Sequence, residues 1–125
     1  MNGEATVADA FHAAGAFRAS LETVRAVLCD FPAIEYHPGW IPATFVGLAE
    51  RRYKFVHVDV DLYEPTKAAI AYFYPRLVGG GAIVIDEYGL LRWPGARRAV
   101  EEFCLDRGIL APIPLTSGNA VLIKK

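Results

Sequence analysis

Apolar positions along this chain recur at two spacings, and the two spacings alternate. Between Leu21 and Phe31 they fall three and four residues apart, as on one face of a helix, and Ser20 is a suitable N-cap. Between Lys54 and Val60 nearly every position is apolar or aromatic, which is typical of a strand covered on both faces. The same patterns predict helices over 43–51, 64–77 and 95–106, and strands over 33–37, 82–86 and, as a pair, 109–125. This order predicts an α/β sandwich with a mostly parallel sheet and a C-terminal antiparallel hairpin.

Glycine positions predict where these elements end. We expect the run Val78–Gly81 to end the helix that begins near Glu64, because glycine accepts the left-handed conformation of a C-cap. Gly108 is expected to stop the next helix in the same way. Ser117-Gly118 lies between two apolar runs, and this pattern predicts the turn of the hairpin.

Composition and charge narrow the class of protein. The chain has 125 residues, 54% of them hydrophobic, and a formal net charge of −1, which suits one globular domain over 1–125. Residues 1–18 are small and weakly patterned, so we expect a mobile arm there. The scattered basic residues form no footprint for nucleic acid, and no apolar run approaches the roughly 20 residues of a membrane helix. Without signal-peptide features, the chain is expected to be cytoplasmic, and Cys29 and Cys104 to be reduced core residues.

Candidate chemistry lies at the ends of two predicted strands. Asp59 and Asp61 follow one strand, and Asp86 and Glu87 follow the next. One helical crossover joins these strands, so we expect them to be neighbours with their carboxyl ends at the same edge of the sheet, where α/β proteins bind ligands. Four carboxylates there would repel one another, and a hard cation such as Mg²⁺ would relieve the repulsion. The alternative is that the acids cap turns and helix starts.

Two segments resemble a known family. VHVDVDLYEPTKAAIAYFYPRLVGGGAIVIDEYG, followed by PGARRAVEEF, is similar to the C-terminal half of the macrocin-type sugar O-methyltransferases. Enzymes of that family modify macrolide and aminocoumarin antibiotics with S-adenosylmethionine. The resemblance extends over residues 19–102, and its specific part is the DxDLYE and IDEYG segments.

The resemblance implies a fold and a set of roles. It implies a seven-stranded doubly wound sheet, with Mg²⁺ held by Asp59, Asp86 and Glu87. Asp61 would be the general base toward a sugar hydroxyl of a glycosylated natural product. The family has Asp-Asp where this chain has Asp86-Glu87, a change that keeps the charge and lengthens one side chain. Metal coordination would lower the pKa of the hydroxyl while the carboxylate takes its proton.

The cofactor half of the family pattern has no match in this sequence. The family binds S-adenosylmethionine on a glycine-rich turn after its first strand, and no such turn precedes Ser20. Gly79–Gly81 follows a helix and precedes a strand, which is the reverse of the order a cofactor loop needs. We expect the sequence to start after the first two strands of the family fold. Gly39 and Trp40 are then the candidate cofactor contacts, Trp40 either stacking on adenine or lying in the core.

The same expectation bears on assembly. In the family's strand order, the two unmatched strands lie between the 33–37 strand and the 54–60 strand. Their absence would expose an apolar strand edge, which favours pairing with another chain. We therefore expect a homodimer or larger oligomer, formed by edge pairing or strand exchange.

Two other functions fit parts of the pattern. One is a catalytically inactive methyltransferase remnant that acts as a dimerisation or regulatory module. The other is a haloacid dehalogenase-type Mg²⁺-dependent phosphatase with Asp59 as nucleophile, although Tyr63 stands where that family has Thr or Val. His57 is interpreted as a core residue. Tyr63 and Tyr88 either line a sugar pocket or are half-buried packing residues, and Arg97 and Arg98 form a solvated charge pattern with the glutamates of their helix.

Overall fold

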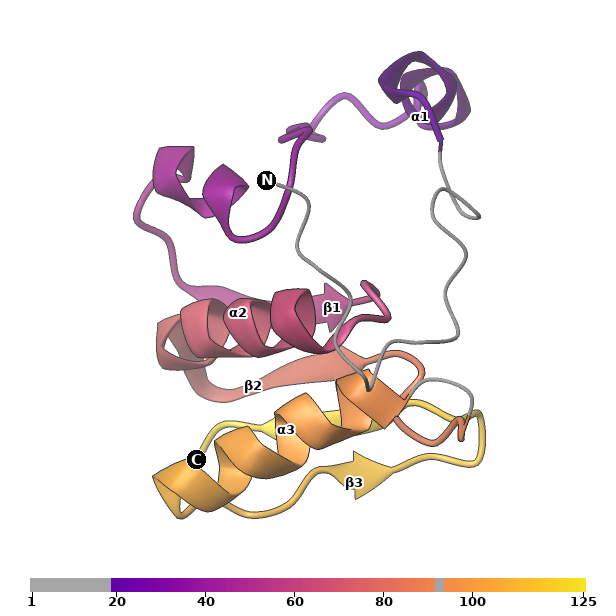
Figure 1. The fold of residues 1–125 in the computed structure, drawn as a ribbon. Coiled ribbons are helices and arrows are strands. Elements are labelled where there is room, and N and C mark those ends of the chain that lie inside the picture. Colours follow the sequence, from indigo (N-terminus) through magenta and orange to yellow (C-terminus); the bar gives the residue numbers. More distant parts are fainter. Residues whose placement is uncertain (1–18, 92–93) are drawn as a thin grey trace.

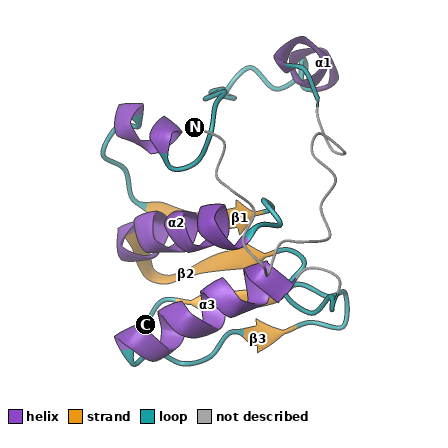
Figure 2. Ribbon diagram, in the orientation of Figure 1, coloured by secondary structure: helices purple, strands orange, loops and turns teal. Residues whose placement is uncertain are grey.

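The computed structural model describes residues 19–91 and 94–125, and it has an α/β architecture (Figures 1 and 2). Two long helices lie together on one side of a small sheet, and the segment before the first strand lies apart from the sheet. The elements, in chain order, are α1 Leu21–Val27, η2 Ala43–Gly47, β1 Tyr53–Val58, α2 Tyr63–Phe73, η3 Tyr74–Arg76, β2 Leu77–Ile85, α3 Pro94–Arg107, β3 Ile113–Pro114 and β4 Ala120–Ile123.

The described sheet has four strands in the order β1-β2-β4-β3. β1 and β2 are parallel neighbours, while β4 is antiparallel to both β2 and β3. The predicted α/β class, the β1–β2 pairing and the C-terminal hairpin are confirmed. This part of the sheet is mixed, because β4 runs against the shared direction of β1, β2 and β3. The strand expected over 33–37 is not formed.

The core lies between the sheet and the pair α2 and α3. Alternate residues of the strands point to the helices, and among them Ile83, Ile85, Ala120 and Leu122 are buried. The helices contribute a matching set, which is Ala69, Ile70, Val100, Phe103 and Cys104. On the opposite face of the sheet, which α2 and α3 leave uncovered, Phe55 is 62% exposed and Ile123 is 49% exposed.

Several local predictions hold closely. Ser20 caps α1 by accepting a hydrogen bond from the Thr23 amide at 3.1 Å. α3 begins one residue before and ends one residue after its predicted range, and Gly108 stops it with a φ of 60°. The hairpin turns at Gly118, whose φ of 95° is easy only for glycine.

The glycine run was misassigned. Val78–Gly81 lies within β2, and the helix before it has already ended at Phe73. A Cβ on Gly81 would come within 3.2 Å of the carbonyl oxygens of both Tyr53 and Lys54 in β1, so glycine serves the close approach of two strands here. Pro75 ends the α-helix instead, because it has no N–H to donate.

The segment before β1 differs from the predictions. Residues 33–37 form no strand, because no strand in the described ranges lies beside them to take their backbone hydrogen bonds. The helix expected over 43–51 is a short 3₁₀ helix that ends at Gly47, after which Leu48 is extended. β1 is not covered on both faces, and Cys29 and His57 are exposed rather than in the core, unlike Cys104.

The arm expected over 1–18 lies outside the described residues. No helix in the described ranges combines the length and the apolar character needed to span a bilayer.

Candidate functional site

The candidate site lies where β1 and β2 end. Val58 and Ile85 are paired in the parallel register, so Asp59 and Asp86 each follow a strand at the same level of the sheet. The Asp86 amide donates a hydrogen bond to the Val58 carbonyl at 2.9 Å, which extends the pairing by one residue. The structure therefore places two of the predicted acids on adjacent strand ends, with Asp61 and Glu87 in the loops that follow.

Both acid-bearing loops contain a left-handed residue. The backbone angle φ is 56° at Asp61 and 57° at Glu87, and such positive values are uncommon for residues other than glycine. Each such position costs on the order of 1 kcal/mol and persists only where surrounding contacts fix it. The acids most distant from the strands are thus held in conformations that the local sequence does not favour.

The hairpin supports the Asp86 loop, and this contact was not predicted. β4 begins opposite the end of β2, with Ala120 paired to Ile85, so Asn119 stands beside Asp86 and its side-chain amide donates a hydrogen bond to Oδ1 of Asp86. The Gly89 amide donates to the Gly118 carbonyl at 2.6 Å. The sequence does show an asparagine directly before the last strand. This asparagine indicates a contact with Asp86 only when the register of β4 against β2 is known.

Helix α3 contacts two tyrosines that follow the acids, Tyr63 at the start of α2 and Tyr88 in the loop after β2. The Tyr63 hydroxyl, two residues after Asp61, donates to Oε2 of Glu102. The Tyr88 hydroxyl, directly after Glu87, donates to Oε1 of Glu101 at 3.2 Å. Both tyrosines are buried, so neither lines an open sugar pocket in this structure.

The predicted ion pairs of α3 are present and belong to these contacts. Arg97 Nε lies 2.8 Å from Oε1 of Glu101, and Arg98 Nε lies 2.8 Å from Oε1 of Glu102. The hydrogen bond from Tyr63 and the bond from Arg98 lower the pKa of Glu102 to about 2. Burial raises the pKa of Tyr88 above its ordinary value. At neutral pH the Tyr88 hydroxyl therefore keeps the proton that it donates.

The side chains at the site offer the kind of donor atom that a hard cation binds. Asp59 is exposed, whereas Asp61, Asp86 and Glu87 are half-buried, and all four offer carboxylate oxygens, the ligand type that Mg²⁺ prefers. Within the described residues, no three His, Cys, Asp or Glu side chains are gathered closely enough to hold an ion. The residues therefore fit a divalent cation by donor type, and Asp59 and Asp86 lie directly after adjacent strand ends.

The candidate cofactor contacts lie elsewhere in the chain. Trp40 is 68% exposed, so it is not a core residue. Gly39 has a φ of +144°, and a Cβ there would come within 2.7 Å of Thr44, so the turn before η2 requires glycine. This requirement is a structural reason for Gly39 that involves no ligand.

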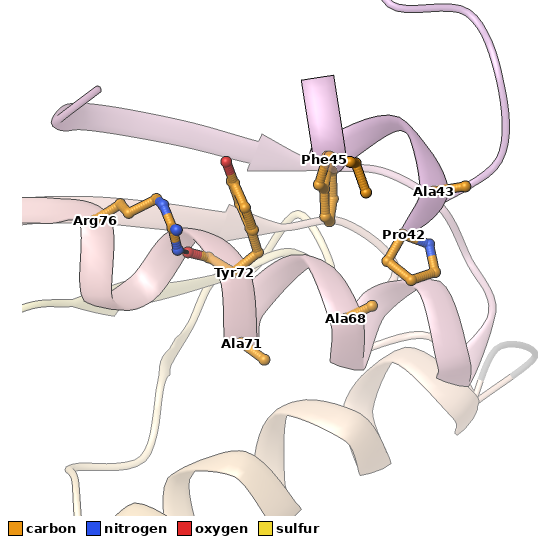
Figure 3. A pocket seen from close by; sticks show the side chains of 8 residues that line it. Pro42, Ala43, Phe45, Ala68, Ala71, Tyr72 and Arg76 are labelled. Carbon is orange, nitrogen blue, oxygen red and sulfur yellow. Dashed lines mark hydrogen bonds between the residues drawn. The ribbon is translucent and has the colours of Figure 1, made fainter. Parts of the chain in front are cut away.

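A shallow pocket of about 710 Å³ lies between η2 and α2 (Figure 3). Its lining is mainly apolar and includes Phe45, Tyr72 and Ala68, with Arg76 at one end. Arg76 lies over the Tyr72 ring at 4.0 Å from its centroid and donates to the Tyr72 carbonyl at 3.0 Å. Neither Trp40 nor any of the four acids lines this pocket, so it is separate from the candidate site.

Comparison with known proteins identifies the family. Residues 5–125 match the sequence profile of the family Macrocin-O-methyltransferase (TylF). The chain belongs to the macrocin O-methyltransferase family. Membership favours the methyltransferase interpretation over the haloacid dehalogenase alternative.

Individual relatives agree with this assignment. The chain is 32% identical over 111 residues to the 8-demethyl-8-(2,3-dimethoxy-alpha-L-rhamnosyl)-tetracenomycin-C 4′-O-methyltransferase of Streptomyces olivaceus, covering 86% of this chain and 41% of the relative. It is 33% identical over 76 residues to the mycinamicin III 3″-O-methyltransferase of Micromonospora griseorubida, covering 61% of this chain and 29% of the relative. This member of the macrocin O-methyltransferase family therefore spans less than half the length of these relatives.

The solved structure of the O-methyltransferase NovP has the same fold. It superposes with a TM-score of 0.75 at 23% identity, over 86% of this chain and 46% of NovP. The α/β arrangement of this family member is therefore that of part of a methyltransferase domain.

Proposed function

We propose that this member of the macrocin O-methyltransferase family takes part in the Mg²⁺-dependent transfer of a methyl group from S-adenosylmethionine to a sugar hydroxyl. The observation that carries the proposal is the placement of Asp59 and Asp86 directly after the paired residues Val58 and Ile85. Family membership supports the methyl-transfer chemistry, and the oxygen-only donor set supports a hard cation.

The four acids would divide into two roles. Asp59, Asp86 and Glu87 would hold the cation at the edge of the sheet, and Asn119 would orient the Asp86 carboxylate through its hydrogen bond. Bound Mg²⁺ would lower the pKa of a coordinated hydroxyl. Asp61, which lies beyond the strand end, would then accept the hydroxyl proton on its carboxylate as the methyl group is transferred.

The names of the relatives support one class of acceptor. Two of them are named for O-methylation of tetracenomycin and mycinamicin compounds, and a third is the demethyldecarbamoylnovobiocin O-methyltransferase of Streptomyces niveus. We infer that the acceptor is a sugar on a glycosylated natural product of antibiotic biosynthesis. Because the methyl donor carries its own activated leaving group, the protein needs to supply mainly alignment of donor and acceptor.

Calorimetry with the full chain tests the proposal. MgCl₂ titrated into the protein should give saturable binding, and S-adenosylmethionine titrated in the presence of Mg²⁺ should give binding of its own. CaCl₂ is the matched control, because Ca²⁺ accepts the same oxygen ligands with looser geometry. Methyl transfer to the rhamnosylated tetracenomycin acceptor should then stop when EDTA removes the metal.

The outcomes separate the remaining alternatives. Retained Mg²⁺ binding with no S-adenosylmethionine binding at millimolar concentration would favour the inactive remnant. If neither Mg²⁺ nor S-adenosylmethionine binds, the result would contradict the proposed site.

We also propose that a second copy of the chain covers the free edge of β1. β1 is an edge strand of the described sheet, Phe55 on it is 62% exposed, and the ordered segment from Ser20 to Leu48 has no buried residue. Unpaired strand edges with apolar side chains favour association. Light scattering at micromolar concentration should give the mass of a dimer or larger species, and Phe55→Lys should shift it toward the monomer. A stable wild-type monomer would contradict this proposal.

A further inference from the structure

After each acid-bearing loop, or within it, a tyrosine is bonded to α3 by the same set of three residue types, and one of these tyrosines is the first residue of α2. Tyr63, Glu102 and Arg98 form one set, and the other set consists of Tyr88, Glu101 and Arg97. In each set the tyrosine follows an acid of the loop and donates its hydroxyl proton to a glutamate of α3. An arginine one helical turn earlier then holds that glutamate.

The arginines also contact the tyrosine rings. The Arg98 guanidinium carbon lies 5.3 Å from the centroid of the Tyr63 ring, and that of Arg97 lies 5.6 Å from the Tyr88 ring. Each ring is therefore fixed at its hydroxyl by a glutamate and over its face by an arginine. Consecutive positions on a helix point in directions about 100° apart, which lets neighbouring residues of α3 serve two different loops.

The loops need such support because of their backbone. Asp61 and Glu87 are both left-handed, and the anchored tyrosines are two residues and one residue further along the chain. Lys67, one turn into α2, adds a hydrogen bond to the Tyr63 hydroxyl at 2.8 Å. The anchors thus act on the chain immediately beside the two acids whose conformations are least favoured locally.

We propose that Tyr63 with Glu102, and Tyr88 with Glu101, are positioning residues that hold the two loops so that the ligands Asp59 and Glu87 can bind a divalent cation. This inference rests on the proposed function, since it assigns a purpose to the geometry of the same site. None of the four residues is proposed as a metal ligand. They would act through the backbone of the loops, as outer-shell partners of a metal site commonly do.

Single hydroxyl deletions in the full chain test the proposal. Tyr63→Phe should raise amide hydrogen exchange over 59–63 and leave 86–90 unchanged, and Tyr88→Phe should do the reverse. Both variants should weaken Mn²⁺ affinity, measured by electron paramagnetic resonance, about 10- to 100-fold. The matched control is Tyr72→Phe, which removes a hydroxyl from α2 at the separate pocket and should change neither measurement.

Rescue distinguishes positioning from simple packing. Glu102→Gln keeps an oxygen that can accept the Tyr63 hydrogen bond, so it should retain most of the Mn²⁺ affinity, whereas Glu102→Ala should behave like Tyr63→Phe. Melting temperatures close to wild type would show that these effects are local.

Two results would overturn the proposal. One is unchanged exchange in both tyrosine variants, and the other is raised exchange with Mn²⁺ affinity equal to wild type. If wild-type protein binds no Mn²⁺, the proposed function itself fails, and the exchange measurements alone decide whether the tyrosines hold the loops.

Discussion

Asp61→Asn should leave divalent-cation binding close to wild type and lower methyl transfer by about 10²- to 10⁴-fold. The reason is that an amide cannot take the hydroxyl proton, while the carboxylates of the strand ends remain in place. Asp59→Asn should instead abolish cation binding at millimolar concentration. It removes one charged ligand from a site that has few other protein ligands. The two substitutions are chemically identical and lie two residues apart, so the contrast isolates the two roles.

Calorimetry for Mg²⁺ and a radiolabelled methyl-transfer assay together measure this contrast. Asp106→Asn is the control, since Asp106 is an exposed acid near the far end of α3 and should change neither quantity. If Asp59→Asn and Asp61→Asn both retain the wild-type affinity for Mg²⁺, the assignment of the metal ligands is wrong. If both lose it equally, Asp61 is a ligand rather than a base.

The parts of the fold that could be predicted depend on local chemistry. α3 was located to within one residue because its apolar face and its glycine stop are both features of the local sequence. The adjacency of Asp59 and Asp86 followed from one short crossover between two apolar strands, since such crossovers join neighbouring parallel strands.

The parts that could not be predicted depend on contacts distant in sequence. Residues 33–37 have the composition of a strand, but a strand requires a neighbour, and none lies beside them in the described ranges. The run Val78–Gly81 has the composition of a helix end. Its actual place in β2 is set by the nearby carbonyls of β1, which leave no room for a Cβ at Gly81.

The support of the site was hidden for the same reason. Arg97, Arg98 and their glutamates read as a solvated helix face, and their ion pairs are indeed present. That the glutamates also receive hydrogen bonds from Tyr63 and Tyr88 follows only from the packing of α3 over both loops. Periodicity identifies which residues a helix exposes, but it does not identify the loop that those residues will meet.

Ile85→Ala should lower the free energy of unfolding by about 2–5 kcal/mol, the range for an isoleucine or leucine removed from a packed core. Ile85 is 0% exposed, and it ends β2 directly before Asp86. Its side chain packs in the cluster that joins both helices to the sheet, so neighbouring atoms can fill the resulting cavity only in part. Urea denaturation measures the loss as a lower midpoint with an unchanged slope.

Ile123→Ala is the matched control for this prediction, because it removes the same atoms from the same sheet. Ile123 lies on the face that α2 and α3 leave uncovered and is 49% exposed, so its loss should be within about 0.5 kcal/mol, as for most surface positions. Equal losses at the two positions would contradict a core confined to the helix side of the sheet. A large loss at Ile123 that grows with protein concentration would show instead that a second copy covers this face, since stabilisation by association increases with the logarithm of the partner concentration.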